Sequence, residues 1–127
     1  MNAPTLCGMV RPIMSPTIYH MCRAEEWRAA QAVGRYGGSS QDVADGFIHF
    51  STALQVEASA AKHRAGQDGL VLLEVDAARL GPALKWEPAR GGQLFPHLYG
   101  SLPVAAVKAV HDLPLVDGRH HFPLLRG

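Results

Sequence analysis

The chain has 127 residues and a formal net charge of +1, and 47% of its residues are hydrophobic against 18% charged. This length and balance predict one globular domain with its own hydrophobic core and exclude an intrinsically disordered chain. Lys and Arg are scattered along the sequence rather than gathered in a basic run, which argues against nucleic acid as a partner.

The first 16 residues differ from the rest of the chain because they contain three prolines and no apolar periodicity. We predict a disordered or mis-started tail over residues 1–16, with Met14 as an alternative start of translation, and a single domain over residues 17–127. No run resembles a secretory signal or is long enough to span a bilayer, so no membrane partner is expected. With only Cys7 and Cys22 present, no disulfide framework is indicated and a cytoplasmic location is expected.

The predicted elements make an α+β domain. In chain order, we expect a strand over 17–22, a helix over 24–33, a loop over 35–42, a strand over 47–50, a helix over 52–64 and strands over 70–76, 84–87, 94–99 and 106–113. Gly34 ends the first helix, and the Asp117-Gly118 pair predicts a turn near the end of the chain. The loop is polar except for Tyr36, so it is either a lid over a pocket or an ordinary surface loop.

His49 lies in a short apolar strand directly before the second predicted helix. Thr52 and Gln55 have the spacing of a capping box, which places the helix start near Thr52. Free N–H groups at a helix start favour an anionic or oxygen-rich ligand, so His49, Ser51 and Thr52 are candidate ligand contacts. The alternative is a structural histidine that is hydrogen-bonded to a backbone carbonyl.

A second histidine lies in the strand predicted over 94–99. Strict alternation places Phe95, His97 and Tyr99 on one face, which indicates the wall of a pocket, although aromatic residues in strands also serve only in packing. Pro96 lacks an N–H and therefore predicts an edge strand or a bulge. Two inward-facing histidines in one small domain predict a shared site, with His97 close to His49.

Other chemistries have weaker support in the sequence. None of the seven histidines has metal-ligand spacing, so no metal site is expected. Ser51 has no identifiable base and orienting group, which argues against a serine nucleophile. Glu87 follows Trp86 and is either a general acid with a raised pKa or the ion-pair partner of Arg90.

Several segments together resemble the bacterial and plant family named domain of unknown function 952, over about residues 17–123. They are 18–20, 46–52, 71–76, 84–87 and 90–100. That family is similar in architecture to the ADP-ribosyltransferases. The resemblance therefore implies a split β-sheet core with two or three helices and a cleft that holds NAD as a substrate or ligand, without a permanently bound cofactor.

The resemblance also implies roles for individual residues. In ADP-ribosyltransferases an early-strand His or Arg, followed by a small hydroxyl residue, holds the ribose, and an aromatic, Ser or His on a later strand contacts the nicotinamide. The candidate catalytic residues are therefore His49 and His97, and the candidate nucleotide contacts are His49, Ser51, Thr52, Tyr99 and Tyr36. The sequence departs from the family pattern where many transferases carry a late-strand Glu, because residues 106–113 offer only Lys108, His111 and Asp112.

Two classes of function follow from this resemblance. The first is an enzyme that binds NAD or a related nucleotide and transfers ADP-ribose or cleaves the nicotinamide bond. The second is a non-catalytic module that binds a small ligand or a peptide in the same cleft. Because the late-strand Glu is missing, both classes stay open, and the sequence leaves the oligomeric state open as well.

Overall fold

The computed structural model describes residues 16–125, so the predicted tail, with Cys7 and Met14, lies outside the described residues except for Pro16. A four-stranded antiparallel sheet forms the centre of the fold, in the order β4-β1-β5-β9. Its strands are β1 (Thr17–Arg23), β4 (Ser51–Thr52), β5 (Leu70–Asp76) and β9 (Val107–Leu113). The interior strand β5 is nearly continuous in apolar residues because both of its faces are covered.

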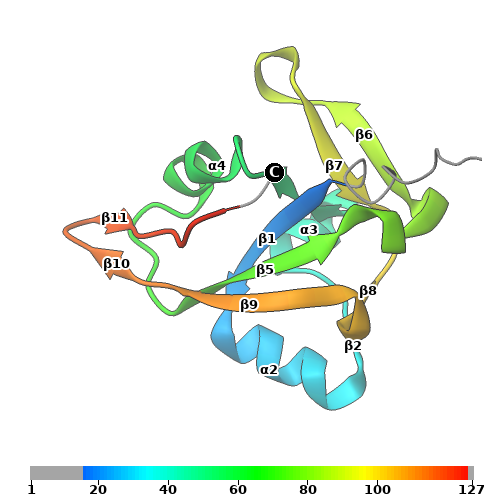
Figure 1. Cartoon of the computed structure of the whole chain (residues 1–127), viewed down its shortest axis with the longest axis horizontal. Helices are drawn as coiled ribbons and strands as arrows, with labels where there is room; N and C mark the ends of the chain where they lie inside the picture. Colours follow the sequence, from blue (N-terminus) through cyan, green and yellow to red (C-terminus); the bar gives the residue numbers. More distant parts are fainter. Residues whose placement is uncertain (1–15, 126–127) are drawn as a thin grey trace, which may run out of the picture.

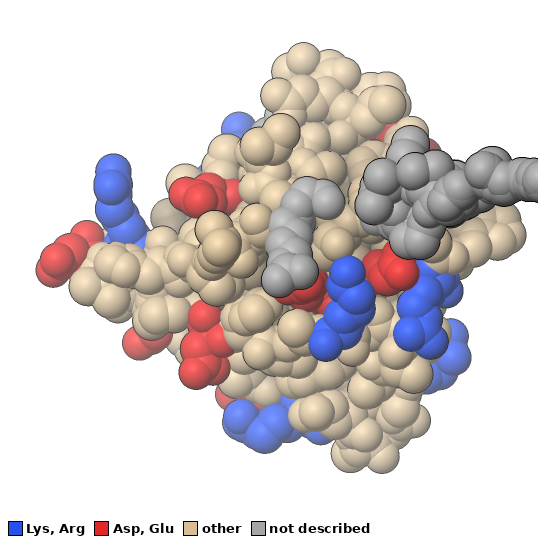
Figure 2. Space-filling model, viewed as in Figure 1, with Lys and Arg blue, Asp and Glu red and all other residues tan. Residues whose placement is uncertain are grey.

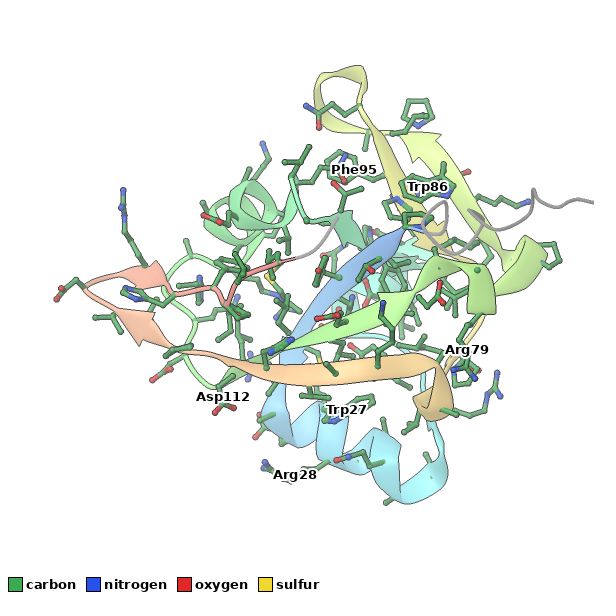
Figure 3. All side chains as sticks on the ribbon, in the orientation of Figure 1. Trp27, Arg28, Arg79, Trp86, Phe95 and Asp112 are labelled. Atoms are coloured by element: carbon green, nitrogen blue, oxygen red, sulfur yellow. The ribbon has the colours of Figure 1, made fainter. Side chains whose placement is uncertain are left out.

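Two hydrophobic clusters cover the two faces of this sheet. On one face, Ile18, Cys22 and Leu73 belong to a cluster that contains Trp27 of helix α2 (Ala24–Val33). Figure 3 shows Trp27 between α2 and the strands. On the other face, Tyr19 and its neighbours pack with the N-terminal part of helix α4 (Val56–His63); this cluster comprises Tyr19, Val56, Leu70, Leu72 and Leu113. The period of two along β1 and β5 therefore separates the clusters.

A second antiparallel sheet, in the order β3-β7-β6, lies beside the first (Figure 1). Its strands are β3 (Ile48–His49), β6 (Leu84–Pro88) and β7 (Leu94–Leu98). Only Phe50 separates β3 from β4, so one short segment pairs with β7 on one side and with β1 on the other. This segment brings the candidate residues at 49–52 to the junction of the two sheets.

The remaining elements are short. Strand β2 (Arg35–Tyr36) pairs with β8 (Leu102–Pro103), and β10 (Leu115–Val116) pairs with β11 (Arg119–His120) around the predicted Asp117-Gly118 turn. Together with α3 (Ser40–Asp45), the described residues contain three α-helices, and the α+β class is confirmed. Four 3-10 turns precede β6, β7 and β9: η2 (Ala77–Arg79), η3 (Gly81–Ala83), η4 (Arg90–Gly92) and η5 (Val104–Ala106). Within residues 16–125, no helix is both long and apolar enough to cross a membrane.

The segment predicted as a loop over 35–42 is irregular only at residues 37–39. It contains β2 and the start of α3, and Tyr36 is only 3% exposed. Helix α3 begins at a capping box in which Ser39 accepts a hydrogen bond from the Asp42 N–H, while the Asp42 carboxylate accepts one from the Ser39 N–H. These contacts and buried Tyr36 anchor the segment to the fold, and the lid interpretation stays a prediction.

The second helix starts later than predicted. Helix α4 begins at Val56 after Gln55, and Thr52 lies in β4. Half of the predicted capping box exists, because the Gln55 side chain accepts a hydrogen bond from the Thr52 N–H at 3.0 Å. The pairing of β4 with β1 holds Thr52 in extended backbone, and the turn through Ala53 and Leu54 delays the helix. His49 therefore does not lie at a helix N-terminus.

Of the two alternatives predicted from Pro96, an edge strand or a bulge, the edge strand is wrong. Strand β7 is the middle strand of its sheet, and Pro96 is fully buried opposite Trp86. Its carbonyl oxygen accepts a hydrogen bond from the N–H of Phe50, which belongs to neither β3 nor β4. The ladder is interrupted at Phe50, so the missing proline N–H costs no regular pairing there.

Candidate functional site

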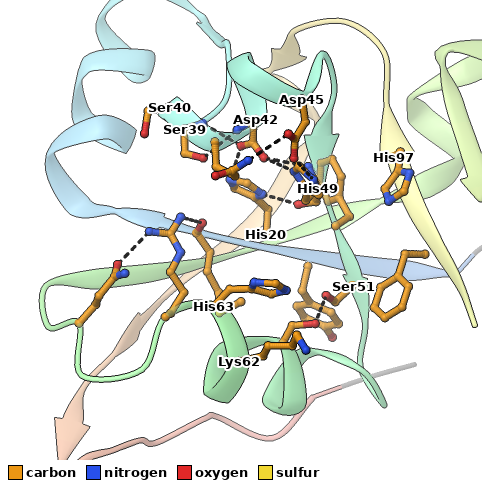
Figure 4. A pocket seen from close by; sticks show the side chains of 18 of the residues that line it. His20, Ser39, Ser40, Asp42, Asp45, His49, Ser51, Lys62, His63 and His97 are labelled. Carbon is orange, nitrogen blue, oxygen red and sulfur yellow. Dashed lines mark hydrogen bonds and ion pairs between the residues drawn. The ribbon is translucent and has the colours of Figure 1, made fainter. Parts of the chain in front are cut away.

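A cleft of about 760 Å³ opens at the junction of the two sheets. Figure 4 shows that its lining side chains come from β1, α3, β3, α4 and β7. Among the residues predicted from sequence, the lining contains His49, Ser51 and His97. The other three predicted contacts, Tyr36, Thr52 and Tyr99, are not part of this lining. The cleft has the size of ordinary small-molecule sites.

Asp42 is the centre of the hydrogen-bond network at this cleft. Its side chain is 3% exposed, and it accepts hydrogen bonds from the backbone N–H groups of Ser39 at 2.7 Å and His49 at 3.1 Å. It also contacts the rings of His49 and, at 3.6 Å, His20. Burial alone raises the pKa of Asp42, but the hydrogen bonds from His49 and from the two backbone N–H groups outweigh it and lower the pKa to about 2.

Gly38 makes the close approach that this carboxylate requires. Its φ is +98°, and a Cβ atom added there would lie 2.7 Å from Cβ of Asp42. We expect Gly38→Ala to lower the free energy of unfolding by between about 1 and 2 kcal/mol, because it combines an unfavourable φ with this clash. Gly37→Ala is the matched control, since no atom lies within 4 Å and its φ is ordinary. Urea unfolding of both variants tests this, and equal stabilities would contradict it.

His49 is held as a cation. Its Nδ1 contacts Oδ1 of Asp42, and its Nε2 lies 3.0 Å from Oδ2 of Asp45. Carboxylates only accept hydrogen bonds, so both ring nitrogens of His49 donate and the ring is an imidazolium. The Asp42 hydrogen bond is the main cause of a raised pKa for His49, and Asp45 adds to it. Since one cation stands between two carboxylates, this group carries a net negative charge and does not form the anion site that we predicted.

His20 completes the network, and the sequence analysis did not assign it a role. Its Nδ1 lies 2.6 Å from the carbonyl oxygen of His49, so Nδ1 donates and Nε2 is left as an acceptor. The Tyr36 hydroxyl donates to Nε2 at 2.8 Å and is itself hydrogen-bonded with the Cys22 thiol. Burial lowers the pKa of His20, which is consistent with a neutral ring. Alternation along β1, which places His20 on the face of Ile18 and Cys22, was the available signal.

The Tyr36 hydroxyl therefore has a structural role in the core. We expect Tyr36→Phe to lower the free energy of unfolding by about 1 kcal/mol, because Nε2 of buried His20 loses its donor. Tyr99→Phe is the control: that hydroxyl donates to Glu87 at 2.7 Å, but Tyr99 is 41% exposed and water replaces the bond. Thermal unfolding compares the variants, and a larger loss for Tyr99→Phe would contradict the expectation.

His97 lies directly opposite His49 in the pairing of β3 with β7. The ring centroids are 5.6 Å apart, which confirms the predicted proximity. Nδ1 of His97 lies 2.8 Å from Oε1 of Glu87, which also accepts the Tyr99 hydroxyl. Phe47 stacks on the His97 ring at 4.2 Å between centroids. The predicted face of Phe95, His97 and Tyr99 exists, but Tyr99 extends beyond the cleft lining.

Glu87 orients His97 and is not a general acid. The hydrogen bonds from His97 and then Tyr99 lower the pKa of its carboxyl, which is opposite to what a proton donor requires. The alternative ion pair with Arg90 involves a side chain outside the described part of the structure. The interaction found, a carboxylate on Nδ1 of a histidine, fixes the tautomer of that ring.

The remaining candidates have other partners. The Ser51 hydroxyl donates to the Ser59 hydroxyl at 3.0 Å. On β9, Lys108 reaches Thr17 and His111 reaches Glu74, and neither lines the cleft. Among residues 16–125, no group of three or more His, Cys, Asp and Glu side chains is arranged to hold a metal ion.

The cleft lining also contains three cationic side chains, together with the carboxylate of Glu26. Arg23 at the end of β1, Lys62 in α4 and Arg64 just after α4 all contribute to the lining. Arg64 is half-buried and is fixed by hydrogen bonds to the Gln67 side chain and the Met21 carbonyl, each at 3.0 Å. On the face of the molecule in Figure 2, by contrast, acidic and basic side chains are interspersed. Three cationic side chains therefore belong to the cleft lining.

Comparison with known proteins now identifies the family. Residues 21–110 match the family described as protein of unknown function (DUF952). The chain belongs to the DUF952 family. No curated protein matches the chain.

This DUF952 protein is similar to solved structures of a protein from Caulobacter crescentus. The crystal structure of protein CC0527 from Caulobacter crescentus is 50% identical, with a TM-score of 0.80, over 83% of this chain and 93% of that chain. The solution NMR structure of CC0527 is 49% identical, with a TM-score of 0.73, over 82% of this chain and 90% of that chain. The part that matches DUF952 includes Asp42, His49 and His97, whereas His20 lies one residue before it.

Proposed function

We propose that the cleft binds NAD or a related nucleotide. The observation that carries this proposal is that the cleft has two unlike walls: Arg23, Lys62 and Arg64 on one side, and a histidine-rich wall with Phe95 on the other. A dinucleotide has the matching chemistry, since it joins phosphates to ribose hydroxyls and planar rings. Guanidinium and ammonium groups suit phosphate, while imidazole and aromatic rings suit the sugar and the base.

The arrangement of the two sheets supports the same proposal. The sheets meet at the β3–β4 segment, as in the split core that the resemblance to ADP-ribosyltransferases implies. In this proposal His49, Ser51 and His97 lie at the ribose and nicotinamide end of the ligand. Thr52 and Tyr99 frame that end from outside the cleft lining, and Tyr36 acts only through His20.

A non-catalytic binding module is the second candidate, and one observation favours it. The carboxylates near the two histidines are engaged: Asp42 and Asp45 by His49, and Glu87 by His97. Strand β9 supplies no carboxylate to the cleft lining. In the module, the same cleft retains a small ligand or a peptide without turnover; in the enzyme, ADP-ribose is transferred or the nicotinamide bond is cleaved.

Calorimetric titration with NAD, followed by an assay of released nicotinamide in the same sample, tests the proposal. Lys62→Ala is expected to weaken binding several-fold, because it removes a cleft cation. Lys108→Ala is the matched control, since Lys108 is hydrogen-bonded to Thr17 and lies outside the cleft lining. No heat of binding for the wild type would overturn the proposal. Binding without nicotinamide release would favour the module, and binding with release would favour the enzyme.

A further inference from the structure

His49 and His97 are cross-strand partners, but carboxylates contact both ring nitrogens of His49 and only Nδ1 of His97. Building on the proposed nucleotide cleft, we propose that His97, oriented by Glu87, is the general base of an NAD-cleaving reaction whose acceptor is water. Beyond nucleotide binding, the cleft would then hydrolyse NAD, with His97 as the base. It rests on the geometry of the two rings and their carboxylate partners.

The position of Glu87 fixes the His97 tautomer. Oε1 of Glu87 lies 2.8 Å from Nδ1 of His97 and only accepts hydrogen bonds, so Nδ1 carries a proton, and in the neutral ring Nε2 is the nitrogen that keeps its lone pair. No described side chain is a hydrogen-bond partner of Nε2. The ring is 7% exposed, lines the cleft and is held in its plane by stacking on Phe47. A ligand in the cleft therefore meets an oriented acceptor nitrogen.

His49 cannot act as the base in this arrangement. Both of its nitrogens donate to carboxylates, one to Asp42 and one to Asp45, so the ring has no lone pair to accept a proton. The three groups together carry one positive and two negative charges. Their net negative charge favours a cationic, oxocarbenium-like transition state at the ribose. Asp45 and Asp42 thereby provide negative charge at the cleft, to whose lining β9 contributes no carboxylate.

The reaction balances without any further reactant. The bond between ribose C1′ and the nicotinamide nitrogen breaks, and its electron pair leaves with nicotinamide, which changes from a pyridinium cation to a neutral ring. The oxygen of a water molecule bonds to C1′ while Nε2 of His97 takes one of its protons. The imidazolium so formed is stabilised by Glu87 and then releases its proton to solvent. The products are ADP-ribose, nicotinamide and one proton.

A general base positioned in the cleft indicates that the group that accepts ADP-ribose carries an O–H. Water and alcohols are weak nucleophiles until a proton is removed, so they benefit from a base at the acceptor side. A carboxylate or thiolate acceptor is already deprotonated and needs no such group. The described lining contains no cysteine; among its four serines, Ser51 donates to Ser59 and Ser39 accepts from the Asp42 N–H, which leaves Ser40 as a further hydroxyl. Water in the cleft is therefore the simplest acceptor.

The test measures nicotinamide release and NAD binding for wild type, His97→Ala, Glu87→Gln and a control. The control is His111→Ala, because the His111–Glu74 pair at 3.0 Å resembles His97–Glu87 but lies outside the cleft lining. We expect His97→Ala to lower kcat by roughly 100-fold or more, with NAD affinity changed less than about 3-fold. Glu87→Gln is expected to lower kcat less than His97→Ala, and His111→Ala not at all.

The results distinguish failure of the hydrolysis proposal from failure of the nucleotide-binding proposal. Wild-type protein that binds NAD without releasing nicotinamide overturns the hydrolysis and leaves the nucleotide proposal standing. Wild-type protein that fails to bind NAD overturns both. Unchanged kcat in His97→Ala, with release in the wild type, removes His97 as the base. Nitrogen NMR of the histidine rings adds a readout without ligand: a proton on Nε2 of His97 at neutral pH also overturns the assignment, whereas a proton on Nδ1 alone supports it.

Discussion

Asp42→Asn is expected to lower the free energy of unfolding by about 3 kcal/mol, because the buried carboxylate holds a cation and two backbone N–H groups at once. Removing its charge leaves His49 without its main partner and places an amide NH2 against donors. For a domain of this size, the melting temperature should fall by about 10 °C or more. Urea and thermal unfolding measure the loss.

The control for this variant is Asp45→Asn. Asp45 contacts the other nitrogen of the same histidine, but its side chain is 38% exposed and solvent screens the pair. We expect it to lower the free energy of unfolding by less than about 1 kcal/mol. An NMR titration provides a second readout, since Asp42→Asn should lower the pKa of His49 further than Asp45→Asn does. Equal losses of stability in the two variants would show that Asp42 is not the centre of the network.

Much of the framework was predictable from sequence because it depends on local patterns. The apolar run at residues 70–76 and the helix formers at 24–33 match β5 and α2. The proximity of His49 and His97 was predicted from a simpler consideration, that buried imidazoles need partners and small domains have few places to provide them. The pairing of β3 with β7 places His49 opposite His97. What these patterns predict is which side chains face inward.

The central carboxylate was missed because its role depends on tertiary structure. Asp42 stands in a polar, glycine-containing stretch, and nothing in that stretch indicates burial beneath a histidine from β3 and another from β1. One local signal did exist: Ser39 and Asp42 have the spacing of a capping box, which predicts the start of α3. This spacing predicts where α3 starts but does not predict which face of α3 is buried.

The errors around His49 have the same physical origin. The capping-box pattern at Thr52 and Gln55 suggested a helix start, but pairing of β4 with β1 keeps Thr52 extended and only the Gln55 half of the box forms. As a result, carboxylates instead of free helix N–H groups surround the His49 ring. Strand pairing overrides the local helix propensity at Thr52. As a result, His49 lies between two carboxylates and not at a helix N-terminus that would bind an anion.

The stability that Asp42 provides should depend on pH in a defined window. The pKa of its carboxyl is about 2 in the fold against an ordinary value of 3.8, because hydrogen bonds from His49 and backbone N–H groups outweigh its burial. A group with a lowered pKa stabilises the fold above its unfolded value and loses that contribution as pH falls. Between pH of about 4 and 2, this single group should account for about 2 kcal/mol.

His49, the partner of this carboxylate, sets the upper pH limit of the stabilisation. The pKa of His49 is raised above its ordinary value of 6.5, mainly by the Asp42 hydrogen bond. Its contribution is therefore complete below pH 6.5 and is lost as pH rises through the folded pKa. The difference in unfolding free energy between wild type and Asp42→Asn should be largest between about pH 4 and 6.5 and should shrink on both sides. Urea unfolding across pH 2–9 measures it; a difference that stays constant would show that the two proteins do not differ through this ion pair.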